Sequence, residues 1–91
     1  MRIAWTPAAA ADLEQISDFL FEQNPATAVR LVRQTYSAAS TLKQFPNKGR
    51  PAKKEGTREL VLPGLPWIII YEAGGQAVYI VRILHGAQHW P

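Results

Sequence analysis

Most of the residues in this sequence that could perform chemistry are basic, and they are concentrated in one short stretch. Residues 43–58 hold six lysines and arginines against a single acid, Glu55, which gives the stretch a net charge of +5 in a chain whose total is +3. A basic patch attracts polyanions by releasing their counterions, and it steers acidic partners toward itself. Nucleic acid or an acidic peptide is therefore a reasonable class of partner, although a solvated loop without function has the same composition.

Arg82 is a separate candidate, because it stands between apolar neighbours in the last strand-like segment. Cleavage of RNA by its own 2′-hydroxyl needs a base, positive charge for the pentavalent phosphate and an acid for the leaving oxygen. Arg82 could supply that positive charge from the face or rim of a sheet. It could equally form an ordinary cross-strand ion pair with Glu59 or Glu72.

Two histidines near the end of the sequence are candidates for proton transfer. His85 and His89 could each act as base or acid, because histidine as a residue type suits proton transfer near neutral pH. Their spacing of four would suit a metal ion only on a helix, and Gly86 between them argues against a helix. The sequence has no cluster of acids with metal-ligand spacing and no Gly-rich phosphate loop, so neither a metal nor a cofactor is expected.

Three tryptophans could stack on nucleic-acid bases. Trp5 and Trp67 fall in predicted strands, however, so packing in the core is the better interpretation for both. Trp90 lies beyond the last predicted strand.

Composition excludes several classes of protein. With 91 residues the chain is expected to form a single unit, residues 1–91, around one core. The absence of cysteine excludes disulfides, thiolate zinc sites and cysteine nucleophiles, and it fits a reducing cytoplasm. The N-terminus lacks the apolar stretch of a secretory signal, and the longest apolar run, Trp67–Tyr71, is too short to cross a bilayer. We therefore expect a soluble, cytoplasmic protein with no membrane partner.

The first half of the chain predicts a short strand followed by two helices. Thr6-Pro7 and Asn24-Pro25 each combine a capping side chain with a proline suited to the first helical position. Apolar residues then recur at spacings of three and four, which places them on one face of each helix: Ala9, Leu13, Ile16 and Leu20 in the first, and Ala28, Val32, Thr35, Ala39 and Leu42 in the second. The second helix is expected to run to about residue 45. Residues 45–51 break the periodicity and are predicted to be a loop.

The second half predicts three strands over residues 57–62, 67–72 and 77–85, where β-branched and aromatic residues dominate. Gly74-Gly75 is typical of a hairpin turn between the last two strands. The segment Trp67–Tyr71 is apolar at odd and even positions, which favours a central strand covered on both faces. The predicted fold is α+β in the order β-α-α-β-β-β, with a helical hairpin packed on a mainly antiparallel four-stranded sheet.

The order of these segments resembles the RelE/ParE toxins of bacterial type II toxin-antitoxin modules. The resemblance runs nearly from end to end and lies in Trp5-Thr6-Pro7, Asp12-Leu13, Asn24-Pro25, Leu42-Lys43-Gln44-Phe45-Pro46, Gly49-Arg50, Gly56-Thr57-Arg58-Glu59-Leu60, Trp67-Ile68-Ile69-Ile70-Tyr71 and Val81-Arg82-Ile83-Leu84-His85-Gly86-Ala87. The family contains RelE-like members, which cleave mRNA in the ribosomal A site, and ParE-like members, which poison DNA gyrase. The ending Leu84-His85-Gly86-Ala87, followed by Trp90-Pro91, looks more like the ParE type.

The resemblance implies the toxin of a plasmid-stabilisation module that inhibits DNA gyrase without an enzymatic step. It also implies a cognate antitoxin, ParD-like or RelB-like and encoded in the same operon, that neutralises the toxin and alone links it to operator DNA. Two alternatives remain open. One is a RelE-like mRNA endonuclease that acts on the ribosome and its mRNA, and the other is a non-toxic antitoxin-binding or co-repressor subunit.

The resemblance also sorts the candidate site residues. A ParE-like toxin needs no catalytic residue, whereas a RelE-like nuclease would use Arg82, Arg58, Lys53, Lys54 and His85. Arg58 could instead pair with Glu55 or anchor the antitoxin. The candidates for partner contacts are Arg50, Lys53, Lys54, Arg58, Arg82, His85, His89 and Trp90.

Overall fold

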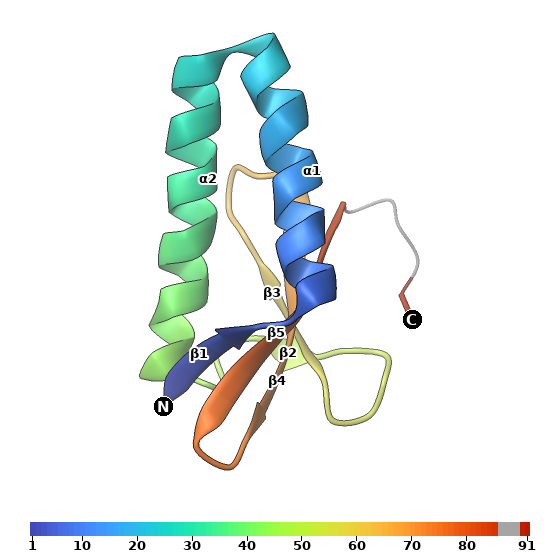
Figure 1. The fold of residues 1–91 in the computed structure, drawn as a ribbon. Helices are drawn as coiled ribbons and strands as arrows, with labels where there is room; N and C mark the ends of the chain where they lie inside the picture. The colour runs from blue at the N-terminus through green and yellow to red at the C-terminus, as the bar shows by residue number, and fades with distance from the viewer. Residues whose placement is uncertain (86–89) are drawn as a thin grey trace.

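The computed structural model describes residues 1–85 and 90–91, and in it a helical hairpin packs on one face of a sheet (Figure 1). The elements in chain order are β1 (Arg2–Trp5), α1 (Pro7–Gln23), α2 (Pro25–Ser40), the 3₁₀ turn η1 (Thr41–Lys43), β2 (Arg50–Pro51), β3 (Arg58–Val61), β4 (Trp67–Gly74) and β5 (Ala77–His85). The α+β class predicted from the sequence is confirmed.

Both helices begin at the residues that the sequence indicated. The Thr6 hydroxyl accepts a hydrogen bond from the Ala9 amide at 3.2 Å, and the Asn24 side chain accepts one from the Thr27 amide at 3.1 Å. Each cap precedes a proline at the first helical position, where no amide hydrogen is needed. The backbone of Asn24 is extended, and its backbone amide donates to the Leu20 carbonyl at 2.8 Å. Asn24 therefore both ends α1 and starts α2. This tight break produces the antiparallel hairpin.

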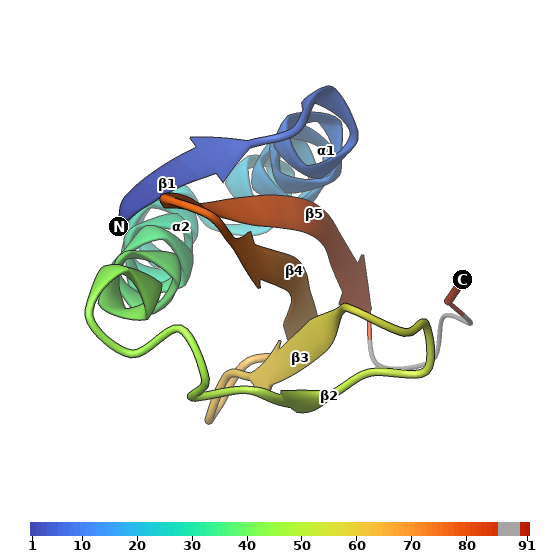
Figure 2. The ribbon, with the colours of Figure 1, turned by 90° about the horizontal axis from the view of Figure 1, so that it is seen from below.

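The sheet has the strand order β1-β5-β4-β3-β2, with β1 parallel to β5 and the other neighbours antiparallel (Figure 2). The strand β4 is central, as its continuous apolar run predicted. The expectation of four strands is wrong by one, because β2 pairs with β3 inside the segment predicted to be a loop. Because β2 has two residues, it is too short to show the alternation of polar and apolar side chains by which a strand is predicted from sequence. The second helix also ends at Ser40 and tightens into η1 instead of continuing to about residue 45.

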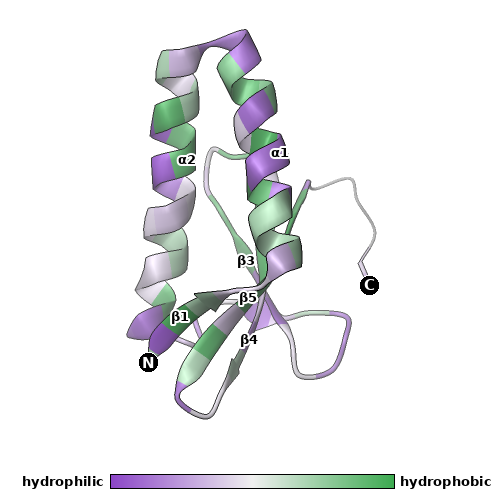
Figure 3. Ribbon diagram, in the orientation of Figure 1, coloured by the Kyte–Doolittle hydropathy of each residue, from purple (hydrophilic) through white to green (hydrophobic). Residues whose placement is uncertain are grey.

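The core lies between the hairpin and the covered face of the sheet. Its central side chains are Trp67, Ile69 and Tyr71 of β4, with Val78, Ile80 and Ile83 of β5, and they meet Ala9, Ala39 and Leu42 from the helical side. Polar and apolar residues alternate along both helices, as their sequence periodicity predicts (Figure 3). Within the described residues, no helix is both long enough and apolar enough to cross a membrane.

A buried hydrogen bond ties α2 to the sheet and gives the first testable prediction. The Trp67 indole donates to the Thr35 hydroxyl at 3.0 Å, and that hydroxyl donates to the Leu31 carbonyl at 2.9 Å. Thr35→Val keeps the shape but leaves the buried indole N–H without an acceptor, so we expect the free energy of unfolding to fall by about 1 to 3 kcal/mol. Urea unfolding measures this free energy for the wild type and the variant. In a Trp67→Phe background the same substitution should cost clearly less, and an equal cost would exclude the hydrogen bond as the cause.

Candidate functional site

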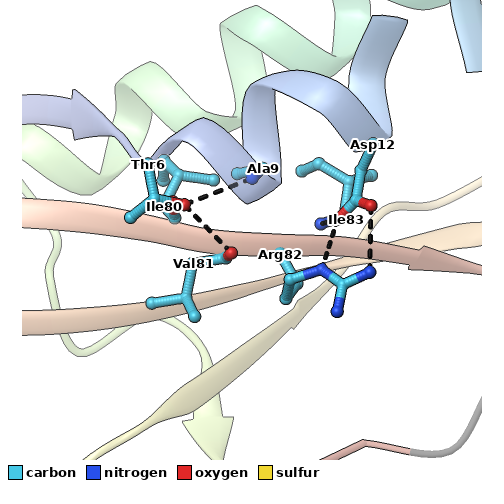
Figure 4. A network of polar contacts seen from close by, with 7 residues as sticks. All are labelled: Thr6, Ala9, Asp12, Ile80, Val81, Arg82 and Ile83. Atoms are coloured by element: carbon cyan, nitrogen blue, oxygen red, sulfur yellow. Dashed lines mark hydrogen bonds and ion pairs between the residues drawn. The ribbon is translucent and has the colours of Figure 1, made fainter. Parts of the chain in front are cut away.

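The first turns of α1 cover an open edge of β5. The strand β1 ends with Trp5 opposite Ile80, so beyond Ile80 the strand β5 keeps β4 on one side and has no neighbouring strand on the other. The Thr6 hydroxyl donates to the carbonyls of Ile80 and Val81 at 2.9 and 3.1 Å (Figure 4). Further along, the Asp12 carboxylate accepts the Ile83 amide at 3.0 Å. These side chains replace the missing strand, because buried backbone groups need partners.

The same Asp12 carboxylate holds Arg82. The Arg82 Nε lies 2.7 Å from Asp12 Oδ2 and its Nη2 lies 3.0 Å from Oδ1, so the pair is bidentate (Figure 4). The side chains are 35% and 15% exposed. The hydrogen bonds that Arg82 donates to Asp12, together with the negative charge of Asp12, raise the pKa of Arg82 above the ordinary arginine value, and the guanidinium remains protonated. The expected cross-strand pairs of Arg82 with Glu59 or Glu72 are therefore wrong, since its partner comes from α1.

Arg58 is engaged in a second network, below the segment that joins η1 to β2. Its Nη1 donates to the Gly49 carbonyl at 2.7 Å instead of pairing with Glu55. The Gly49 amide donates to the Tyr71 hydroxyl, and that hydroxyl donates to the Pro46 carbonyl, both at 2.8 Å. Tyr71 is fully buried, so it anchors this segment to the core.

Arg50 forms an ion pair with Glu59 directly across β2 and β3. The Arg50 side chain is 70% exposed, so solvent screens the pair and its contribution to stability is small. Arg50 is thus available at the surface as a partner contact, with Glu59 as its neighbour of opposite charge.

Lys53, Lys54 and Trp90 come together beside the face of the sheet that the helices leave uncovered. The Lys54 ammonium lies 6.0 Å from the centroid of the Trp90 ring, at the limit of a cation–π contact. A hollow of about 390 Å³ is lined here by Pro51, Ala52, Lys53, Glu59, Ile68, Ile70, Leu84 and Trp90. Trp90 is therefore a surface-facing residue in this region, whereas Trp67 is in the core and Trp5 packs on Tyr36 with ring centroids 5.1 Å apart.

His85 ends β5 and is exposed. It lines a small hollow of about 90 Å³ with Asp12, Gln15, Ile16, Trp67 and Ile83. The other candidate histidine, His89, lies outside the described residues. In the part of the chain that the structure describes, no three histidines or acids gather closely enough to hold a metal ion.

The proposed catalytic residues therefore do not form one constellation. Arg58 pairs in register with Tyr71, whose side chain is in the core under the helices, while Lys53 borders the hollow on the opposite face of the sheet. Arg82 is held at the edge of β5. Asp12, Gly49 and Tyr71, which organise these networks, were not singled out as site residues from the sequence, because their partners lie 9 to 71 positions away.

Comparison with known proteins identifies the family. The protein-family model described as "ParE toxin of type II toxin-antitoxin system, parDE" matches residues 3–90 of this chain. The chain belongs to the ParE toxin family. The resemblance read from the sequence is thereby confirmed, together with the role of a toxin of a type II toxin-antitoxin system.

Named relatives of this ParE-family chain agree in sequence and in fold. The protein Y4kP of Sinorhizobium fredii is 37% identical over 90 residues, which cover 99% of this chain and 93% of the relative. Toxin RelE2 of Caulobacter vibrioides is 34% identical over 87 residues, covering 96% and 97%. A solved structure titled "Chromosomal ParDE TA system from P. aeruginosa" superimposes with a TM-score of 0.87 at 32% identity, covering 93% of this chain and 95% of that one.

Proposed function

We propose that this ParE-family toxin, as a single domain acting in the cytoplasm, binds and inhibits DNA gyrase without breaking a bond itself, and that a cognate antitoxin neutralises it. The observation that carries the proposal is the bidentate ion pair of Arg82 with Asp12. A nuclease needs that guanidinium free to stabilise a pentavalent phosphate. Here its Nε and Nη2 already donate to a carboxylate, and the carboxylate would repel a phosphate.

The scatter of the other candidates supports the same conclusion. General acid–base catalysis requires groups within hydrogen-bond reach of one reacting phosphate. Arg58 donates to the Gly49 carbonyl and lies opposite Tyr71, whose side chain is in the core, whereas Lys53 lies on the other face of the sheet. A toxin that acts by occupying a surface of its target needs no such convergence.

The mRNA endonuclease stays as a second candidate because of one feature, the hollow that contains Lys53 and Trp90. A cation beside an aromatic ring can hold a phosphate and stack a base. The hollow could therefore bind RNA. Arg82, however, is engaged with Asp12, so the positive charge that the transition state of RNA cleavage requires is missing.

The two candidates are separated by purified components and the variant Arg82→Ala. We expect the wild-type toxin to inhibit supercoiling by gyrase, with accumulation of cleaved DNA, and to leave mRNA on programmed ribosomes intact. Arg82→Ala should retain inhibition to within about threefold, because Arg82 has no chemical step to accelerate. For a nuclease the same substitution should lower cleavage by about 10²-fold or more. Cleaved mRNA with unaffected supercoiling would overturn the proposal.

A groove on α2 is a suitable docking site for the antitoxin. It measures about 670 Å³ and lies between α2 and the connection from β3 to β4, and its apolar lining includes Val29, Leu62 and Leu65. Arg30 and Arg33 line its rim. The sequence has no acid from residue 23 to residue 54, so an acidic amphipathic segment that folds on binding would meet only favourable charge.

Reversing the charge of this rim should produce a toxin that escapes its antitoxin. We expect Arg30→Glu with Arg33→Glu to weaken antitoxin binding about 100-fold, since two attractive pairs become repulsive, while inhibition of gyrase persists. Isothermal titration with the antitoxin encoded beside the toxin measures the affinity. Lys43→Glu with Lys48→Glu makes the same change of charge away from the groove and serves as the control for antitoxin binding, because neither lysine lines the groove. Equal losses in both double variants would assign the effect to overall charge and not to the groove.

A further inference from the structure

The turn formed by residues 45–48, here called the Phe45 turn, presents an aromatic ring to solvent. Phe45 is 60% exposed. It belongs to the segment that joins η1 to β2, and this segment lies at the end of the molecule opposite the tip of the hairpin (Figure 1). Its carbonyl accepts the Lys48 amide and its amide donates to the Thr41 carbonyl, both at 3.1 Å. The backbone on both sides of the ring is therefore fixed.

The Phe45 turn is also anchored from below. The buried Tyr71 hydroxyl donates to the Pro46 carbonyl and accepts from the Gly49 amide, each at 2.8 Å. Arg58 holds the Gly49 carbonyl at 2.7 Å. An exposed aromatic on a segment held by three such bonds keeps its position in the free protein. Less conformational entropy is then lost when a partner covers it.

The charged residues that flank Phe45 in the sequence are of one sign. Lys43 and Lys48 flank Phe45 in the sequence, and the Lys48 ammonium lies 3.5 Å from the Thr41 hydroxyl, beside the turn. No acid occurs between residues 23 and 54. Residues 44–48, Phe45 among them, line a hollow of about 590 Å³. The complementary surface is an apolar pocket with an acidic rim.

We propose that the Phe45 turn is the contact through which the toxin binds its protein target, with Phe45 inserted in an apolar pocket and the two lysines facing acidic side chains. The proposal deepens the proposed function and rests on it for the identity of the target. A protein fits better than a nucleic acid, because proteins that bind single strands carry several aromatics along a groove. Between Tyr36 and Trp67 the sequence has Phe45 as its one aromatic residue. A preorganised aromatic with a charged rim is typical of an interface hot spot.

A matched pair of variants tests the turn. Phe19, on α1 near the tip of the hairpin, is also 60% exposed, so Phe45→Ala and Phe19→Ala remove the same exposed side chain from opposite ends of the molecule. We expect Phe45→Ala to raise the toxin concentration for half-inhibition of gyrase by about 30-fold or more, and Phe19→Ala to change it less than threefold. Both variants should melt like the wild type and bind the antitoxin as tightly, because the Phe45 turn shares no lining residue with the groove on α2.

A second variant and a second readout keep the test decisive. Lys43→Gln with Lys48→Gln should weaken inhibition about three- to tenfold at low salt, and the difference should shrink at high salt. If Phe45→Ala lowers the melting temperature, this double variant carries the test. Growth arrest after induction measures the toxicity of the Phe45 and Phe19 variants without assuming which protein is the target. It therefore separates the proposal that the Phe45 turn contacts the target from the proposal that the target is gyrase.

Three results would overturn the inference. One is equal activity of the Phe45 and Phe19 variants in cells and with gyrase. Another is a Phe45→Ala variant that loses only affinity for a bare DNA duplex, since Phe45 would then contact nucleic acid and not a protein. The third is a wild-type chain that neither arrests growth nor inhibits gyrase. Growth arrest by the wild type without inhibition of gyrase, abolished only in Phe45→Ala, would overturn the gyrase proposal and retain the turn as the target contact.

Discussion

Replacing Gly49 by alanine is expected to destabilise the protein by about 3 kcal/mol. A Cβ atom at this position would lie 2.7 Å from the Glu59 carbonyl oxygen and 2.8 Å from both Cε1 and the hydroxyl of Tyr71. The first of these atoms belongs to the backbone of the sheet, and Tyr71 is packed in the core, so neither can withdraw cheaply. Overpacking of this kind costs about 1 to 3 kcal/mol, and moving Gly49 also strains its hydrogen bonds to Tyr71 and Arg58.

The measurement is thermal or urea unfolding of Gly49→Ala beside Gly74→Ala. A loss of 3 kcal/mol lowers the melting temperature of a chain of this size by roughly 12 to 24 °C. Gly74 has open space around the position of its missing Cβ and no left-handed backbone angle, so its alanine variant should stay within about 0.5 kcal/mol of the wild type. A Gly49 variant as stable as the Gly74 variant would mean that the segment before β2 shifts freely, which would also remove the rigidity assigned to the Phe45 turn.

The elements that were predicted well are those specified by neighbouring residues. Thr6 and Asn24 cap their helices through amides three positions away, so both caps are visible in the sequence. The continuous apolar run of β4 indicated that it is central, and the sheet order agrees. Such features depend on backbone geometry over one turn or one strand, and they need no knowledge of the rest of the fold.

The parts that were missed depend on residues far apart in the chain. Arg82 was expected to meet an acid across the sheet. Instead, β1 ends at Trp5, opposite Ile80, and the edge of β5 beyond Ile80 is open to α1, where Asp12 lies 70 positions before Arg82. The strand β2 is formed by pairing with β3, in which Arg50 and Pro51 lie opposite Glu59 and Arg58. The residues next to Arg50 and Pro51 in the sequence have no alternation of polar and apolar side chains that would predict a strand. Single-sequence periodicity contains no information on such contacts, so the family resemblance supplied the function while the geometry of the site had to come from the structure.

Asp12→Ala is expected to be the other strongly destabilising substitution, with a loss of about 2 to 3 kcal/mol. It removes two charge-assisted hydrogen bonds to Arg82 and the acceptor of the Ile83 amide. The value is below that of a fully buried pair because the Arg82 side chain is 35% exposed and water can solvate it in part. Arg82→Ala should cost less, about 1 kcal/mol, since the carboxylate keeps its bond to the Ile83 amide.

A double-mutant cycle measured by urea unfolding apportions these effects. If the ion pair itself contributes, adding Arg82→Ala to Asp12→Ala should cost almost nothing further, and the coupling should be about 1 kcal/mol. Asp12→Asn provides the control for the edge of the strand, because an amide oxygen can still accept the Ile83 amide although the charge is lost, and it should fall between the wild type and Asp12→Ala. Additive losses would show that Asp12 acts on β5 alone and leaves Arg82 free, and that result would remove the main structural argument against a phosphate-binding role for Arg82.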